Sequence, residues 1–146
     1  MLIDHICLAV RSIDSSRNRI CKILDYKEKT RIVKNTKQDV LVQFLSKEGS
    51  LDIKLIQPAS PESPLLSFLK TRGEGMHHIC FRAGDVLETV EALTERGARI
   101  TSEPMTGEAF DDELIAFAYI GSGLNIEIID TLKRRDPICN PDYEQH

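Results

Sequence analysis

The chain has 146 residues, the usual size of one domain, and it is long enough to bury a hydrophobic core without a disulfide or a structural metal. Hydrophobic residues make up 41% and charged residues 29% of the sequence, a balance that excludes a disordered chain. The net charge of −4 argues against a nucleic-acid partner, because nucleic-acid-binding proteins carry a strong basic excess.

The sequence predicts a cytoplasmic protein without a membrane partner. No apolar run reaches the roughly 20 residues that span a membrane, and residues 1–5 lack the basic start and apolar centre of a signal peptide. The four cysteines form no C-x-x-C pair, which favours reduced thiols over a disulfide framework. They are Cys7, Cys21, Cys80 and Cys139.

The first part of the chain predicts a strand, a helix and three further strands. Apolar residues alternate at the N-terminus in the manner of a strand, and Ser12 is placed to cap a helix. The expected strands span residues 3–10, 26–33, 39–46 and 51–57. Three prolines from Pro58 onward then interrupt the sheet and indicate a linker, in which residues 65–69 can form a short helix.

The second part predicts the same succession of elements. A strand is expected at residues 76–83, and a helix follows between its cap Asp85 and the terminating Gly97. Further strands are expected at residues 99–101, 115–119 and 124–130. We expect the remaining tail to be ordered only in part.

An internal repeat with an offset of 73 residues explains this succession. Residues 4–8 return as residues 77–81, and His5 thereby matches His78. The same offset relates residues 42–44 to 115–117 and residues 52–56 to 125–129. We therefore expect an α+β fold in which two pseudo-symmetric βαβββ modules form a curled mixed sheet around a cleft. The expected single domain is 1–131, with modules at 1–57 and 76–131, a linker at 58–75 and a tail at 132–146.

Four residues at repeated positions form one candidate site. A pseudo-two-fold axis brings His5 towards His78, and it brings Lys54 towards Glu127. Imidazole and carboxylate groups on facing strands are suitable ligands for a divalent ion, and a His-His-Glu set leaves coordination positions open for catalysis. The alternative is that both histidines are structural residues at equivalent places in a duplicated fold. Their symmetry, and a glutamate in an otherwise apolar strand, favour a site.

Three stretches of the sequence resemble the vicinal oxygen chelate superfamily, which includes glyoxalase I, bleomycin-resistance proteins, extradiol dioxygenases and methylmalonyl-CoA epimerase. They are Ile3-Asp4-His5-Ile6, the run from Gln57-Pro58 to Pro64, and Gly73-Glu74-Gly75-Met76-His77-His78-Ile79. The last is the most specific. The resemblance covers about residues 2–131, and the epimerase branch is the most similar.

This resemblance implies a metal-assisted epimerase, isomerase or lyase that acts on a small oxyanionic substrate, with acyl-CoA thioesters as first candidates. His5, His78 and Glu127 would bind Co, Ni, Zn, Mn or Mg, and Glu127 would also remove the α-proton. A homodimer is compatible with the family. The alternative function is a metal-free small-molecule-binding protein of the bleomycin-resistance type.

The chain departs from the family pattern at Lys54, where relatives carry a Glu or Gln ligand. An ammonium has no lone pair and repels a divalent cation. Either the metal keeps three protein ligands and more water, or Lys54 is neutral, or its ammonium replaces the charge of the ion. A further alternative is that Lys54 points to the cleft rim and leaves a weakened metal site. A neutral Lys54 would itself be a candidate acid or base.

Two further departures concern proton transfer and the substrate. The strand at residues 39–46 has no carboxylate where the family has its second acid, and Gln43 is the nearest polar residue. The loop at residues 107–113 is acidic where relatives carry glycines and a basic residue. Acidic side chains there would repel the phosphates of coenzyme A.

Overall fold

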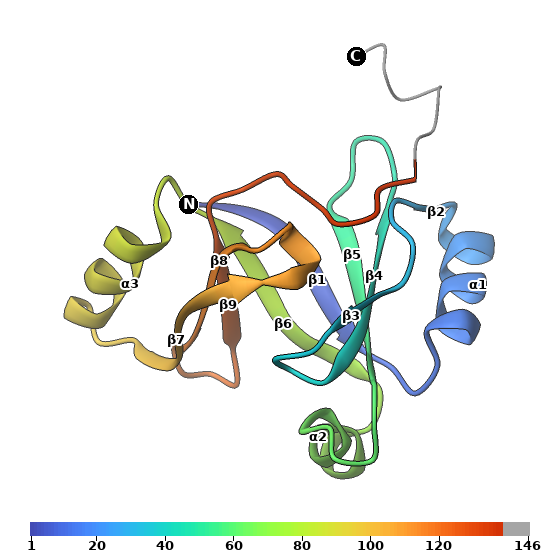
Figure 1. The fold of residues 1–146 in the computed structure, drawn as a ribbon, viewed down its shortest axis with the longest axis horizontal. Coiled ribbons are helices and arrows are strands. Elements are labelled where there is room, and N and C mark those ends of the chain that lie inside the picture. Colours follow the sequence, from blue (N-terminus) through green and yellow to red (C-terminus); the bar gives the residue numbers. More distant parts are fainter. Residues whose placement is uncertain (139–146) are drawn as a thin grey trace.

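In the computed structural model, residues 1–138 are described and form an α+β fold on one nine-stranded mixed sheet. The strands lie in the order β2-β4-β5-β1-β6-β9-β8-β7, and β3 pairs with β4 outside this path. Figure 1 shows that the sheet curls, with α1 and α3 at opposite sides of the molecule. The expected fold class is thus confirmed. Cys139 and residues 139–146 of the expected tail lie outside the described residues.

The elements follow the repeated order predicted from the sequence. The first half consists of β1 (Leu2–Ala9), α1 (Ile13–Leu24), β2 (Lys27–Glu28), β3 (Val33–Asn35), β4 (Val40–Ser46) and β5 (Asp52–Pro58). The helix α2 (Leu65–Arg72) separates the halves. The second half consists of β6 (Gly75–Arg82), α3 (Val86–Glu95), β7 (Arg99–Gly107), the 3-10 helix η1 (Glu108–Phe110), β8 (Glu113–Tyr119) and β9 (Asn125–Ile129).

Strand registers preserve the 73-residue offset. In the antiparallel pair β1·β6, His5 lies opposite Cys80 and Cys7 lies opposite His78, so exchanging the two halves reproduces the same pairing. In the parallel pairs, Cys7 lies opposite Lys54 and Cys80 lies opposite Glu127. The four central strands β5, β1, β6 and β9 are therefore related by a pseudo-two-fold axis between β1 and β6.

The two long helices begin at equivalent positions with equivalent caps. The Ser12 side chain accepts a hydrogen bond from the backbone of Ser15, and the Asp85 side chain accepts one from Glu88. Each cap satisfies a backbone N–H that the first helical turn leaves free. The first residue of each helix, Ile13 or Val86, is buried against the sheet.

Two predicted strands were wrong in extent. The run at residues 26–33 is divided into β2 and β3, because the backbone N–H groups of Lys29 and Thr30 both donate to the carbonyl of Phe44 and that of Arg31 donates to the carbonyl of Asp136. The short strand expected at residues 99–101 continues to Gly107 as β7. It does so despite Pro104 because β7 is an edge strand, where a residue without an N–H is tolerated.

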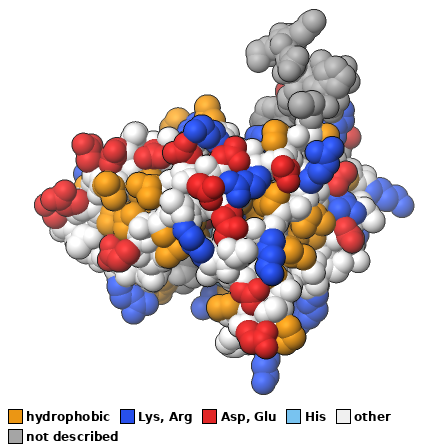
Figure 2. All heavy atoms as spheres, viewed as in Figure 1, with side chains coloured by type: hydrophobic (Ala, Val, Ile, Leu, Met, Phe, Trp, Pro, Cys, Tyr) orange, Lys and Arg blue, Asp and Glu red, His pale blue; other side chains and the backbone are white. Residues whose placement is uncertain are grey.

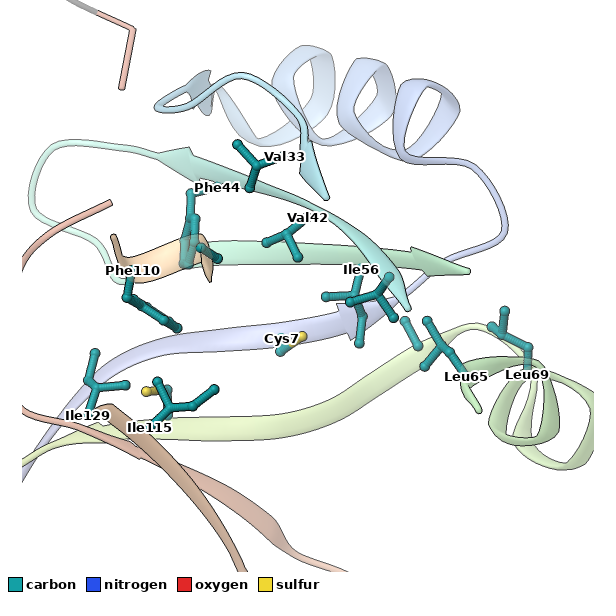
Figure 3. Close-up of a cluster of buried hydrophobic side chains, with 14 residues drawn as sticks. Cys7, Val33, Val42, Phe44, Ile56, Leu65, Leu69, Phe110, Ile115 and Ile129 are labelled. Atoms are coloured by element: carbon teal, nitrogen blue, oxygen red, sulfur yellow. The ribbon is translucent and has the colours of Figure 1, made fainter. Parts of the chain in front are cut away.

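Three hydrophobic clusters stabilise the fold. Two lie between the sheet and the helices α1 and α3, and the third fills the inside of the curl. Figure 3 shows the third cluster, in which Phe44 and Cys7 of the first half meet Phe110, Ile115 and Ile129 of the second. The halves therefore share one core and cannot bury this surface separately.

Two further features of the molecule are the length of its helices and the charge of its surface. None of the helices within residues 1–138 is both long and apolar enough to cross a bilayer. Acidic and basic side chains are interspersed over the face drawn in Figure 2.

The tight packing around Gly107 predicts a strong effect of a small substitution. A Cβ atom at this position would lie 2.8 Å from Cγ2 of Ile115 and 3.2 Å from Cδ2 of Phe110. Because both neighbours are fully buried, we expect Gly107→Ala to lower the free energy of unfolding by about 1–3 kcal/mol. Urea denaturation followed by circular dichroism measures this loss.

Gly84→Ala is the matched control, because a Cβ atom there meets no heavy atom within 4 Å. We expect it to leave the unfolding midpoint unchanged. Equal stability of the two variants would show that the packing around Gly107 is looser than the structure indicates.

Candidate functional site

The carboxylate of Glu127 is the centre of a buried polar cluster. Its Oε1 atom lies 3.1 Å from Nε2 of His5 and 3.5 Å from Nε2 of His78. Its Oε2 atom lies 3.2 Å from Nζ of Lys54. Each of the four side chains is at most 3% exposed. The structure thus brings together all four residues singled out from the repeat, each from one of the central strands.

His5 is oriented by its sequence neighbour. Nδ1 of His5 lies 2.8 Å from Oδ2 of Asp4 and donates its proton to this carboxylate. Burial alone would raise the pKa of Asp4, but the hydrogen bond from His5 and the charges of Arg134 and Arg82 lower it overall. Asp4 is therefore ionised, and its hydrogen bond with Nδ1 orients the ring of His5 so that Nε2 faces Glu127.

His78 is oriented in the same way by His77. The two Nδ1 atoms lie 2.8 Å apart, so one ring donates to the other. Burial lowers the pKa of each of these histidines to about 4, and both are neutral at physiological pH. His77 stands at the position equivalent to Asp4, so the Nδ1 atom of each site histidine is hydrogen-bonded to the side chain of the residue before it.

Lys54 and Glu127 form a buried ion pair. Burial lowers the pKa of an ammonium, but the adjacent carboxylate outweighs burial and the pKa of Lys54 is raised. Burial raises the pKa of a carboxyl group, but the charge of Lys54 and the contacts with His5 and His78 hold the pKa of Glu127 well below its usual value. Lys54 is therefore neither neutral nor directed to the cleft rim, two of the alternatives that the sequence left open.

Two aromatic rings cover this pair. Nζ of Lys54 lies 5.9 Å from the ring centre of Phe44 and 5.1 Å from that of Phe110. Such cation–π contacts stabilise an ammonium that has lost its hydration. The ring of His5 meets Phe44 edge-on at 5.2 Å.

The donor atoms fit a divalent cation. Nε2 of His5 and Nε2 of His78 are buried and have no hydrogen-bond partner among the described residues, because the short contacts with Glu127 lack hydrogen-bond geometry. One atom from each histidine and one carboxylate oxygen lie within 4.8 Å of one another. Two imidazoles and a carboxylate form a common ligand set for such ions. Lys54 opposes this fit, because its ammonium lies on the same carboxylate.

A cavity of about 540 Å³ borders the site on the side of His77 and His78. Lys54 contributes to its wall, whereas His5 and Glu127 lie behind Lys54 and do not. Lys37 is the second cation in the lining, and none of the described residues that line the cavity is acidic. The remaining lining residues are Gln38, Val40, Ile56, Pro64, Leu65, Thr101, Ser102, Met105, Phe117 and Asn125. The cavity therefore presents positive charge and neutral hydrogen-bonding groups to a ligand.

Gln43 does not belong to the site. Its Nε2 atom donates to Glu28 at 2.8 Å and to the carbonyl oxygen of Thr30 at 2.9 Å. Successive strand residues face opposite sides of the sheet, and it is Phe44 that faces Lys54. The second acid or base of the family has no counterpart at Gln43.

The acidic side chains of segment 107–113 have partners within the chain. Glu108 accepts hydrogen bonds from Thr36, and Arg135 pairs with Asp111 and with Asp112. Sequence patterns showed these acids but not Arg135, which offsets part of their charge. They also indicated no role for Phe110, which this segment delivers to the site.

Comparisons of the sequence with known proteins identify relatives of this chain. A family model for the glyoxalase/bleomycin resistance protein/dioxygenase superfamily matches residues 4–117. The uncharacterized protein YqjC of Bacillus subtilis is 31% identical over 102 residues, which cover 67% of this chain and 69% of that protein. The mitochondrial methylmalonyl-CoA epimerase of Bos taurus is 29% identical over 102 residues, which cover 69% of this chain and 57% of that protein.

The solved structure of methylmalonyl-CoA epimerase from Mycobacterium tuberculosis is similar with a TM-score of 0.78 and 25% identity. The match covers 88% of this chain and 86% of that one. The family resemblance inferred from the sequence is thereby confirmed.

The buried ion pair predicts strong coupling between its two members. Lys54→Met leaves the carboxylate of Glu127 without its cation, and we expect the free energy of unfolding to fall by about 3–5 kcal/mol. Lys54→Met combined with Glu127→Leu removes both charges, so its cost should be far smaller than the sum of the two single changes. Urea denaturation of all four proteins in a chelating buffer measures this coupling.

The exposed pair of Lys133 and Glu113 supplies the control. Lys133→Met should not alter stability measurably, because solvent screens this pair. Additive effects of the two site substitutions would mean that Lys54 and Glu127 do not depend on each other.

Proposed function

Because the chain belongs to the glyoxalase/bleomycin resistance protein/dioxygenase superfamily, we propose that it catalyses proton transfer beside a carbonyl group, as an epimerase, isomerase or lyase. One observation carries the proposal: an ammonium group, Lys54, stands between a substrate-sized cavity and a buried carboxylate, Glu127. These are the two charges that enolate formation requires, a donor for the oxygen and an acceptor for the proton.

Substrate binding rearranges the ion pair. The carbonyl oxygen of the substrate accepts a hydrogen bond from Nζ of Lys54, whose flexible side chain turns from Glu127 toward the cavity. His5 and His78 remain beside the carboxylate and keep its orientation. The carboxylate is then less strongly compensated, and it becomes a stronger base.

Proton transfer follows from this arrangement. The C–H bond at the α-carbon breaks, its proton moves to a carboxylate oxygen of Glu127, and its electron pair moves into the carbonyl group. The resulting enolate oxygen is stabilised by the ammonium of Lys54 in a site shielded from water. Protonation of the opposite face of the carbon by a water molecule that enters the cavity, with release of the abstracted proton from Glu127 to solvent, completes an epimerisation.

His5, His78 and Glu127 would hold a divalent ion of the kind that the resemblance implies, namely Co, Ni, Zn, Mn or Mg. When bound, such an ion polarises the substrate carbonyl and stabilises negative charge on its oxygen. Asp4 and His77 would orient the two imidazole ligands through their Nδ1 hydrogen bonds. The ammonium of Lys54 lowers the affinity of this ligand set for any cation.

An acyl-CoA thioester is the substrate class that the relatives favour. Two of them are methylmalonyl-CoA epimerases, and the cavity beside Lys54 has two lysines and no acid in its lining. The internal pairing of the acids at residues 107–113 is compatible with such a substrate. The homodimer stays a prediction.

The ion pair also supports a second function, that of a metal-free binding protein of the bleomycin-resistance type. Lys54 satisfies the charge of Glu127 without an ion, and the pair forms a stable floor for a pocket. Such a pocket would bind a carboxylate or another anion through Lys54 without turnover.

Exchange of the α-proton with solvent deuterium tests the catalytic function. The parent protein should exchange the α-proton of methylmalonyl-CoA, and Glu127→Gln should slow this exchange by at least about 100-fold because it removes the proton acceptor. Mass spectrometry of the thioester in D₂O measures the rate.

Glu113→Gln makes the same chemical change on the neighbouring strand and should retain the parental rate. Parental exchange by Glu127→Gln would exclude Glu127 as the base. Absence of exchange by the parent across acyl-CoA, glutathione-adduct and 2-oxo-acid substrates would favour the binding protein.

Titration with Co²⁺ or Ni²⁺ measures the influence of Lys54 on the cation site. Lys54→Gln removes the opposing charge and introduces a family-like ligand, and we expect affinity to rise at least about tenfold, equivalent to roughly 1.4 kcal/mol. Lys37→Gln removes the other lysine of the cavity and should leave the affinity close to that of the parent. Equal affinities of parent and Lys54→Gln would show that Lys54 does not control cation binding.

A further inference from the structure

Residues 131–138, here called the strap, cross from the second half of the molecule to the first. Figure 1 shows this red segment leaving the end of β9 and running over the fold towards β2. The backbone N–H of Arg135 donates to the carbonyl of Ala109 at 3.0 Å. Further along, the N–H of Ile138 donates to the carbonyl of Lys29 at 2.9 Å. The strap therefore joins η1 to the segment that precedes β3.

Arg134 is the strap residue that reaches the candidate site. It is 7% exposed, and its guanidinium carbon lies 4.5 Å from the ring centre of Phe44 and 5.0 Å from that of Phe110. The same two rings contact the ammonium of Lys54. An aromatic pair thus separates two buried cations.

Arg134 also holds the carboxylate that orients His5. Its Nη2 atom forms a charge-assisted hydrogen bond to Oδ2 of Asp4, the same oxygen that accepts the proton of His5 Nδ1. Nη1 of Arg82 binds the other oxygen of Asp4 at 2.7 Å. The carboxylate is fixed from three sides, so a continuous chain of contacts leads from Arg134 through Asp4 and His5 to Glu127.

Within residues 1–138, the equivalent end of the site has no such closure. The position that the 73-residue offset relates to Arg134 is Pro61, which is exposed. The residue equivalent to Asp4 is His77, and it lines the cavity. The strap residues are not part of that lining. A cleft with two equivalent ends is thus covered at the His5 end and open at the His77 end.

We propose that Arg134 is a positioning residue of this site, which fixes the ring of His5 through Asp4, and that the strap closes the His5 end so that ligands enter beside His77. The positioning of His5 by Arg134 rests on contacts within the chain. Only the expected effect on turnover rests on the proposed function.

Proton NMR of the protein labelled with ¹⁵N-histidine tests the positioning role directly. The Nδ1 proton of His5 should give a downfield, slowly exchanging signal in the parent. Arg134→Gln should speed its exchange with water at least about tenfold, because Asp4 loses one of the two cations that fix it. If the proposed function holds, kcat/KM for α-proton exchange falls 10- to 100-fold in the same variant, as expected for a partner of a ligand residue.

Arg135→Gln is the matched control, because it removes an arginine of the strap that binds only Asp111 and Asp112 through its side chain. It should leave the His5 signal unchanged. Arg134→Lys keeps a positive charge and should show an intermediate exchange rate, which provides a second test if Arg134→Gln fails to fold. Asp4→Asn should reproduce the effect of Arg134→Gln, and combining the two should add little.

A parental His5 signal in Arg134→Gln or, if that variant does not fold, in Arg134→Lys would overturn the proposal. An equal loss of the signal in Arg135→Gln would also overturn it, because docking of the strap as a whole would then be responsible. Loss of the His5 signal only in the Arg134 variants supports the positioning role even where no thioester is turned over, so the two proposals fail separately.

Discussion

A fully buried carboxylate constrains the whole centre of this molecule. Transfer of an ionised group from water to a protein interior costs several kcal/mol unless other groups compensate its charge. Glu127 receives this compensation from the ammonium of Lys54, and the rings of His5 and His78 lie against the same carboxylate. The polar cluster lies beside the central hydrophobic core, where Phe44 and Phe110 shield it from water. Because the cluster lies where the two halves meet, the site forms only when the halves are correctly placed relative to each other.

Duplication supplies the geometry of the site, and differences between the copies supply its chemistry. The offset places Lys54 against Glu127, so equivalent positions carry opposite charges and pair across the axis. It also makes Asp4 equivalent to His77. Each is hydrogen-bonded to the Nδ1 atom of the histidine that follows it. Asp4, however, is an ionised carboxylate held by two arginines, whereas His77 is a neutral ring at the cavity wall. A symmetric scaffold can therefore hold an asymmetric substrate in one direction.

What could be predicted from the sequence is what the repeat determines. The common offset predicted the two modules and the meeting of His5, His78, Lys54 and Glu127, because registers in paired strands are fixed by alternating burial. Features outside the repeat were missed. Phe110 and Arg134 reach the site from segments without regular periodicity, and their contacts span more than one hundred residues in the case of Arg134 and Asp4. No local pattern encodes such contacts. Gln43 was considered for the site only because relatives carry an acid on that strand, and the alternation of β4 directs it to the opposite side.

Lys54 determines which chemistry the cluster can perform. A divalent ion offers open coordination positions to two substrate oxygens at once, whereas an ammonium offers hydrogen bonds from one atom and carries half the charge. The ammonium is covalently attached, however, and Glu127 and two aromatic rings hold it at the cavity wall. In the proposed function it has only to turn from Glu127 toward the substrate, where it meets the negative charge that develops on one oxygen. In the function we propose, a lysine in place of a ligand therefore favours stabilisation of a single oxyanion over chelation of vicinal oxygens. Such a site would serve substrates whose negative charge develops on one oxygen that faces the cavity.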